Sequence, residues 1–155
     1  MTTSSPQPEM REARRADLDA IKALLADDPF SAGREGGADE AVAAAFDEIE
    51  ADRNSTLFVL EHHGRVIGCA QLTVIPGLAR RGMRRGLIEA VRIASDLRGG
   101  GLGRDFIRRL VAEAGARDCG VVQLTSDKRR HDAHRFYVSL GFKMSHEGFK
   151  LDLGR

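Results

Sequence analysis

The chain has no tryptophan, one tyrosine and only two cysteines in 155 residues. Cys69 and Cys119 form no Cys-x-x-Cys pair and have no adjacent histidine, which argues against a disulfide scaffold and against a zinc site. The sequence also lacks any run of 18 apolar residues, and its first residues lack the basic and apolar segments of a secretory signal. We therefore expect a cytoplasmic protein with no metal ion and no membrane partner.

An excess of charge of one sign is missing too. The 24 Lys and Arg residues nearly balance 23 Asp and Glu residues, for a formal net charge of +1. Domains that bind nucleic acid usually carry a large basic excess, so this balance disfavours a nucleic-acid partner. With 42% hydrophobic and 30% charged residues the composition is that of a globular protein. We expect residues 1–8 to form a disordered lead-in and residues 9–155 to form one domain.

The hydrophobic pattern predicts a single α/β (α+β) domain with a mixed sheet. Helices are expected to begin near Asp17, near Asp39, directly after a glycine-rich segment at residues 99–103, and near Asp132. The last of these is expected to end with Gly141 in the left-handed conformation. A basic loop is expected at residues 78–86. The predicted strands cover residues 10–14, 56–61, 66–75, 87–94, 121–125, 142–144 and 147–153, of which 121–125 is expected to be buried.

The strand at residues 87–94 changes its apolar phase part-way along. Ile88 and Ala90 share one parity, whereas Val91 and Ile93 share the other. Because side chains alternate between the two faces of a strand, such a change indicates one extra residue in the pairing. We predict a β-bulge near Ala90 and Val91.

A glycine-rich loop follows this strand and leads into an amphipathic helix. The residues Arg98-Gly99-Gly100-Gly101-Leu102-Gly103 precede apolar positions at Phe106, Ile107, Leu110, Val111 and Ala114. Strand, glycine loop and helix form an arrangement that binds phosphate through backbone N–H groups. No Lys-Ser or Lys-Thr pair follows, which argues against a P-loop, and the glycine spacing does not fit the dinucleotide fingerprint.

The segment at residues 133–142 supplies a second motif. Its sequence Ala-His-Arg-Phe-Tyr-Val-Ser-Leu-Gly-Phe fits A-x-x-F-Y-x-x-x-G-F, and the glycine loop fits R-x-x-G-x-G. Together the two motifs resemble those of the GNAT superfamily of acyl-CoA N-acyltransferases, over the chain from about Met10 to the end. Within that superfamily, residues 128–137 and Ser145-His146 look most like the aminoalkylphosphonate N-acetyltransferase branch.

The resemblance implies a fold and an activity. The fold would be a mixed central sheet of about seven strands with about four helices, in which the central strands are bulged and splayed. The activity would be that of an acyltransferase, an N-acetyltransferase that moves the acetyl group of acetyl-CoA to the primary amine of a small molecule by direct attack. Two alternatives stay open: a non-catalytic acyl-CoA-binding or regulatory module, and acetylation of a protein or peptide amine.

The resemblance also implies roles for individual residues. Tyr137 would protonate the departing CoA thiolate, and Glu89 or a chain of water molecules would take the proton of the amine. A backbone N–H within residues 91–93, which would lie along the cofactor as an added strand does, would polarise the thioester carbonyl. The residues expected to bind the cofactor are Val91, Arg92, Ile93, Arg98, Gly99, Gly100, Gly101, Leu102, Gly103, Arg104 and Arg130.

Some positions depart from the family pattern or are not fixed by it. Arg130 stands where the family commonly has an asparagine, so its contact with the cofactor is open. His146 is a candidate for the acceptor pocket. The identity of the acceptor depends on the loops at residues 30–37 and 76–86, whose conformations the sequence does not define. Because dimers are frequent in the family, the resemblance is compatible with a homodimer.

Overall fold

A computed structural model describes residues 7–31, 33–35 and 38–155. Residues 1–6, most of the predicted lead-in at residues 1–8, lie outside the described residues. The chain divides into two compact units, Met1–Gln123 and Leu124–Arg155, and each is described by itself. The assignment of residues 9–155 to one domain therefore stays a prediction.

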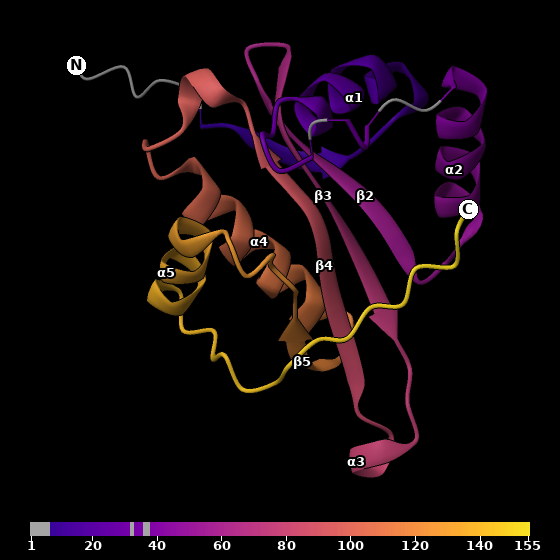
Figure 1. Cartoon of the computed structure of the whole chain (residues 1–155), viewed down its shortest axis with the longest axis vertical. Helices are drawn as coiled ribbons and strands as arrows, with labels where there is room; N and C mark the ends of the chain where they lie inside the picture. Colours follow the sequence, from indigo (N-terminus) through magenta and orange to yellow (C-terminus); the bar gives the residue numbers. More distant parts are fainter. Residues whose placement is uncertain (1–6, 32, 36–37) are drawn as a thin grey trace. The chain divides into compact units, whose positions relative to one another are not determined.

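The first unit contains one mixed five-stranded sheet in the order β1-β2-β3-β4-β5 (Figure 1). The first four strands pair antiparallel, and β5 pairs parallel to β4 after the crossover through α4. The strands of the sheet are β1 (Glu9–Glu12), β2 (Ser55–His62), β3 (Arg65–Ile75), β4 (Arg84–Ile93) and β5 (Cys119–Gln123). The helices of this unit are α1 (Leu18–Ala26), α2 (Asp39–Ala51), α3 (Ala79–Gly82) and α4 (Leu102–Ala116), with 3-10 turns η1 (Arg15–Asp17) and η2 (Ser95–Leu97).

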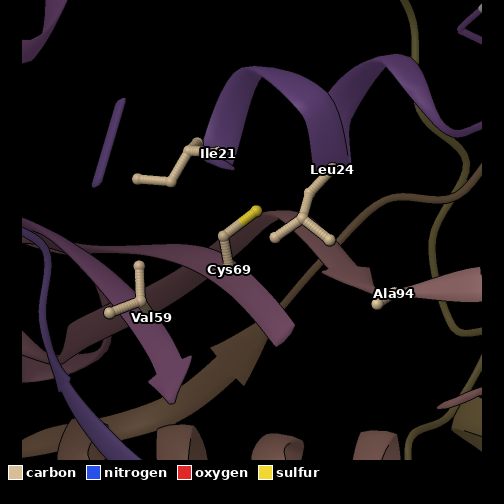
Figure 2. Close-up of a cluster of buried hydrophobic side chains, with 5 residues drawn as sticks. All are labelled: Ile21, Leu24, Val59, Cys69 and Ala94. Atoms are coloured by element: carbon tan, nitrogen blue, oxygen red, sulfur yellow. The ribbon is translucent and has the colours of Figure 1, made fainter. Parts of the chain in front are cut away.

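Helices α1 and α4 pack on opposite faces of the sheet. Cys69 of β3 joins Ile21 and Leu24 of α1 in a cluster of buried side chains that also contains Val59 and Ala94 (Figure 2). On the other face, a Cβ built at Gly86 of β4 would lie 3.0 Å from the Cβ of Ala114 in α4. The glycine at position 86 is therefore explained by the close approach of α4. The buried residues of α4 are Phe106, Ile107, Leu110 and Ala114, whereas Val111, predicted on the same face, is exposed.

The predicted bulge in β4 is confirmed. Gln71 pairs with Glu89 and Cys69 pairs with Arg92, so Ala90 and Val91 together oppose a single residue of β3. Ala90 has a φ of +52°, in the left-handed region that a residue with a Cβ rarely adopts. The extra residue moves the side chains of β4 to the other face, since Gly86 faces α4 while Ala94 lies in the α1 cluster.

The numbers of strands and helices differ from the prediction. The described residues contain five strands rather than about seven, and five helices rather than about four. Residues 142–144 and 147–153 form no strand, and Phe149, Leu151 and Leu153 are exposed. Alternating apolar residues define the face of a strand but not its hydrogen-bonding partner, and a strand without a partner is not stable.

Two further expectations are corrected in the first unit. The predicted basic loop at residues 78–86 is shorter than expected, because α3 forms a turn there and β4 begins at Arg84. Arg80 and Arg81 in that turn have left-handed φ values of 52° and 61°. The strand predicted at residues 121–125 is β5, which covers Cys119–Gln123 instead. It was expected to be buried, yet Val121 is exposed, and within the described residues β5 is an edge strand that pairs with β4 alone.

Candidate active site

The glycine loop connects η2 to the first turn of α4. Gly99 and Gly101 both have a φ of +85°, and a Cβ built on either would meet no atom within 4 Å. Glycine at these positions is thus explained by the backbone conformation, and the space beside the loop is open. The first backbone hydrogen bond of α4 runs from Asp105 N–H to the Gly101 carbonyl, so the amides of residues 102–104 precede the helical ladder. Such amides, with the helix dipole behind them, suit an anion such as a pyrophosphate.

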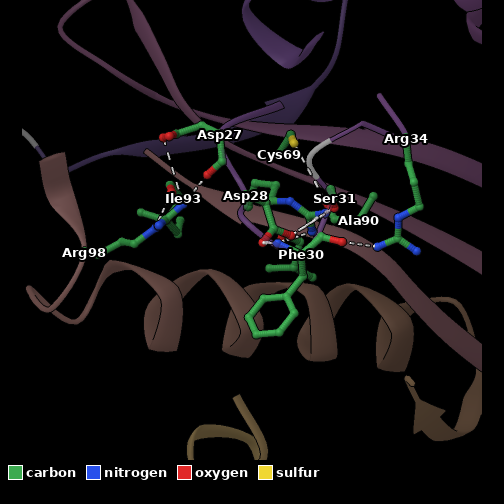
Figure 3. A network of polar contacts seen from close by, with 11 residues as sticks. Asp27, Asp28, Phe30, Ser31, Arg34, Cys69, Ala90, Ile93 and Arg98 are labelled. Carbon is green, nitrogen blue, oxygen red and sulfur yellow. Dashed lines mark hydrogen bonds and ion pairs between the residues drawn. The ribbon is translucent and has the colours of Figure 1, made fainter. Parts of the chain in front are cut away.

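Arg98 ties the glycine loop to the rest of the first unit. Its Nε donates to the carbonyl of Ile93, at the end of β4, at 3.1 Å, and its Nη2 donates to the carbonyl of Asp27, after α1, at 3.0 Å (Figure 3). Both acceptors are backbone atoms, so Arg98 fixes the position of the chain on either side. This geometry favours an orienting role for Arg98 over that of a charge directed at phosphate.

The bulge of β4 presents its peptide groups in a defined direction. The Cys69 thiol donates to the carbonyl of Ala90 at 3.7 Å, and Arg92 Nη1 donates to the carbonyl of Val91 at 2.9 Å. In a trans peptide the N–H points opposite to the carbonyl, so the Val91 N–H is directed away from the Cys69 side chain. The ladder between β4 and β5 ends at Leu87, which leaves the bulged part of β4 outside that pairing.

Glu89 precedes this bulge. It is exposed and lies opposite Gln71 of β3. By alternation from Gly86, which faces α4, its side chain belongs to the face of the sheet that carries α1. Its role as the base stays a prediction, with a chain of water molecules as the alternative.

Tyr137 belongs to the second unit, in α5 (His131–Ser139). The helix ends in a Schellman motif, in which Gly141 N–H donates to the Val138 carbonyl and Phe142 N–H donates to the Tyr137 carbonyl. Gly141 has a φ of +95°, as predicted for the residue after a helix end. The rings of Tyr137 and Phe142 meet edge to face with centroids 5.7 Å apart, so the motif F-Y-x-x-x-G-F encodes this helix end.

Residues 18–142 match the acetyltransferase (GNAT) family. The chain belongs to this family. The expectation that it is an acyltransferase agrees with that assignment, and the mixed α/β sheet is the fold of its relatives.

Three relatives illustrate the similarity of this GNAT protein to known proteins. A transcriptional regulator from Bacillus halodurans C-125 has a solved structure with a TM-score of 0.90 and 39% identity, covering 95% of this chain and 100% of that chain. The structure of an acetyltransferase from Trypanosoma brucei has a TM-score of 0.79 and 27% identity, covering 95% of this chain and 100% of that chain. A curated glucosamine 6-phosphate N-acetyltransferase from Trypanosoma brucei brucei is 33% identical over 97 residues. That match spans 63% of this chain and 64% of the relative's length.

The first unit of this GNAT protein brings most of the predicted site residues into one region. Arg98 contacts Ile93, and the glycine loop leads directly from these residues to the first turn of α4. Arg130 lies in the second unit, where it precedes α5, and its N–H donates to the carbonyl of Asp127. His146 is exposed and hydrogen-bonds to Ser145 Oγ. The roles of Arg130, His146 and Tyr137 toward a cofactor or acceptor stay predictions.

Sequence reasoning missed two buried polar residues beside the bulge. Asp28 and Ser31, in the loop after α1, contact the guanidinium of Arg92 (Figure 3 shows the loop). Ser31 and Arg92 are 61 positions apart, and no local pattern pairs residues at such a distance. A serine and an aspartate in a loop are otherwise typical of turns.

Cys69 is predicted to be an inert thiol. Burial raises its pKa to about 12, so it stays protonated and donates to the Ala90 carbonyl, whereas Cys119 is half-buried. We expect a thiol reagent at mildly alkaline pH to modify one thiol of the native protein and two after unfolding. The variant Cys119→Ala should lose the native-state reaction. Rapid modification of two thiols in the native protein would contradict the assignment.

Within the residues that the structure describes, no cluster of three or more side chains suited to bind a metal ion was found. No helix in this part of the chain is long and apolar enough to cross a membrane.

Proposed function

We propose that this protein transfers the acetyl group of acetyl-CoA to the primary amine of a small molecule. The observation that carries the proposal is the left-handed glycine loop between the bulged strand β4 and the N-terminus of α4. Membership of the acetyltransferase (GNAT) family supports the same reaction.

The backbone of the first unit would hold the donor. The amides of residues 99–104 would bind the pyrophosphate, with Arg98 keeping the loop in place through the Ile93 and Asp27 carbonyls. Residues 91–93 would run along the pantetheine arm as an adjacent strand does. Arg130 would contribute positive charge toward the phosphates.

The chemistry would require a hydrogen-bond donor, a base and an acid. The Val91 N–H would donate to the thioester carbonyl oxygen, where negative charge develops. Glu89, or water, would remove a proton from the amine, whose nitrogen forms the new bond to the acetyl carbon. Tyr137 would give a proton to the sulfur as the carbon–sulfur bond breaks, so that CoA leaves as a thiol.

The acceptor class is suggested by charge and by one relative. Exposed arginines near the β3–β4 connection, Arg80, Arg81 and Arg85, would attract an amine that also carries an anionic group. The curated relative bears the name of an enzyme for glucosamine 6-phosphate, which is such an amine. Aminoalkylphosphonates have the same combination of charges, and His146 is a candidate contact for them.

The experiment is a panel of amines with acetyl-CoA and detection of free CoA thiol. The panel contains glucosamine 6-phosphate, aminoalkylphosphonates, aminoglycosides, polyamines, amino acids and peptide N-termini. We expect amine-dependent release of CoA, fastest with a phosphorylated or phosphonylated amine, and an acetylated product detected by mass spectrometry. Release without an acetylated product would contradict the proposal.

A second candidate function is a regulatory module that binds acetyl-CoA without transferring its acetyl group. The similar structure from Bacillus halodurans bears the name of a transcriptional regulator. Tight binding of acetyl-CoA with no CoA release for any amine of the panel would favour this alternative. Release with peptides alone would instead favour acetylation of a protein or peptide amine.

A further inference from the structure

A buried polar cluster joins the loop after α1 to the bulge of β4, and the chemistry described above gives it no part. Asp28 is 5% exposed and Ser31 is 2% exposed, and both belong to the loop. The side chain of Arg92, on β4, is 17% exposed. Burial of a carboxylate and a guanidinium is costly unless they are paired with good geometry.

The Asp28 carboxylate is well paired within the cluster. Arg92 Nη2 lies 3.0 Å from Asp28 Oδ2 and donates to Ser31 Oγ at 3.0 Å. The Ser31 hydroxyl donates to Asp28 Oδ2 at 3.0 Å, and Phe30 N–H donates to Asp28 Oδ1 at 3.1 Å. The loop is thereby closed on itself and attached to Arg92.

The same guanidinium also holds the bulge. Arg92 Nη1 donates to the carbonyl of Val91 at 2.9 Å. Arg92 Nε is buried and has no hydrogen-bond partner within the described residues. Three partners therefore set the orientation of the guanidinium: the Asp28 carboxylate, the Ser31 hydroxyl and the Val91 carbonyl. They hold it in this orientation although the Nε donor is left without a partner there.

We propose that Arg92 and Asp28 are positioning residues for acetyl transfer, which couple the loop after α1 to the bulge. Asp28 fixes the Arg92 guanidinium, which in turn holds the carbonyl of the Val91–Arg92 peptide. The Val91 N–H belongs to the preceding peptide, whose carbonyl accepts from the Cys69 thiol, so the two contacts together fix Val91 with its N–H pointing out of the bulge. The inference rests on the proposed function, in which that N–H donates to the thioester carbonyl oxygen. Neither side chain touches the reacting atoms.

The kinetic test uses Arg92→Lys and Asp28→Asn. Lysine keeps the charge but cannot reach three partners in the guanidinium geometry, and asparagine keeps the size of Asp28 without its charge. We expect either variant to lower kcat about 10- to 100-fold, because a displacement of about 1 Å at the reacting centre has effects of that order. The KM for acetyl-CoA should change less than kcat does, since the glycine loop that would hold the pyrophosphate is unchanged. The double variant should lower kcat no further than the more affected single variant, because the two residues act as a unit.

Arg65→Lys is the matched control. Arg65 makes a bidentate ion pair with Asp96, with N–O distances of 2.8 and 2.9 Å. Both side chains are exposed, unlike those of Arg92 and Asp28. We expect kcat of this variant to be unchanged. Calorimetric titration with acetyl-CoA counts the binding sites in each preparation, and kcat is expressed per binding site so that a loss of folded protein is not mistaken for a slower reaction. Unchanged kcat in Arg92→Lys and Asp28→Asn, or a loss that only follows the number of binding sites, would overturn the proposal.

Amide hydrogen exchange tests the coupling without turnover. Arg92→Lys should speed exchange at Phe30 and Ser31, and Asp28→Asn should speed exchange at residues 91–93. If the wild-type protein releases no CoA with any amine, the proposed function fails, and the exchange data still decide whether loop and bulge are coupled. If exchange at Phe30 and Ser31 is unchanged in Arg92→Lys, and exchange at residues 91–93 is unchanged in Asp28→Asn, the loop and the bulge are not coupled.

Discussion

Replacing Tyr137 with phenylalanine is expected to lower kcat about 10- to 1000-fold while leaving acetyl-CoA affinity nearly unchanged, because in the proposed mechanism the phenol proton is needed only as the thiolate leaves. Phenylalanine keeps the ring contacts with Phe136 and Phe142, whose centroids lie 5.2 and 5.7 Å away. The Schellman motif at the end of α5 uses backbone groups, which the substitution does not alter. The measurements are steady-state kinetics by CoA release and acetyl-CoA binding by calorimetry.

Tyr137→Leu separates the proposed proton transfer by Tyr137 from its packing against Phe142. Leucine removes both the phenol and the edge-to-face ring contact with Phe142. If the role of Tyr137 is proton transfer, the phenylalanine and leucine variants should be similarly slow, and leucine alone should lower the melting temperature. If Tyr137→Phe turns over at the wild-type rate, Tyr137 has no part in the chemistry.

Replacing Gly101 with aspartate is expected to abolish acetyl-CoA binding without unfolding the protein. The φ of +85° at Gly101 disfavours a residue with a Cβ by about 1–2 kcal/mol. The space beside the loop is open, so the side chain has room, but it would place a carboxylate where the phosphates are expected. Calorimetric titration with acetyl-CoA measures the binding, and circular dichroism with thermal denaturation checks the fold.

Two variants serve as controls for Gly101→Asp. Gly101→Asn adds a side chain of the same size without charge, and asparagine tolerates the left-handed region, so weakened but measurable binding is expected. Gly64→Asp introduces aspartate at another open position of similar φ, +76°, in the turn between β2 and β3, and should bind as the wild type does. Wild-type affinity in Gly101→Asp would show that the glycine loop does not hold the phosphates.

Features with a local cause were the ones the sequence predicted well. The apolar phase change at Ala90 and Val91 predicted the bulge, because one extra residue reverses which face each later side chain occupies. Gly141 was expected in the left-handed region after α5, and its φ of +95° agrees. Each of these features depends on a few consecutive residues, so the pattern and its cause lie in the same stretch of chain.

The predictions that depended on a distant partner were less successful. Residues 147–153 have the alternation of a strand, yet Phe149 and Leu151 are exposed and no ladder forms there. Arg92 was expected to bind the cofactor. Its guanidinium has a second set of contacts, with Asp28 and Ser31, that the sequence did not indicate.

The sequence by itself determined the family, the bulged strand, the glycine loop and the helix end at Gly141, because periodicity and glycine placement act over a few residues. Only the tertiary structure decided that Arg98 donates to the carbonyls of Ile93 and Asp27, and that Arg92 connects the loop after α1 to the bulge of β4. It also decided the direction of the Val91 N–H, which follows from the contact between the Ala90 carbonyl and the Cys69 thiol. These contacts form between residues far apart in the chain, and their geometry is fixed when the sheet and α1 pack together.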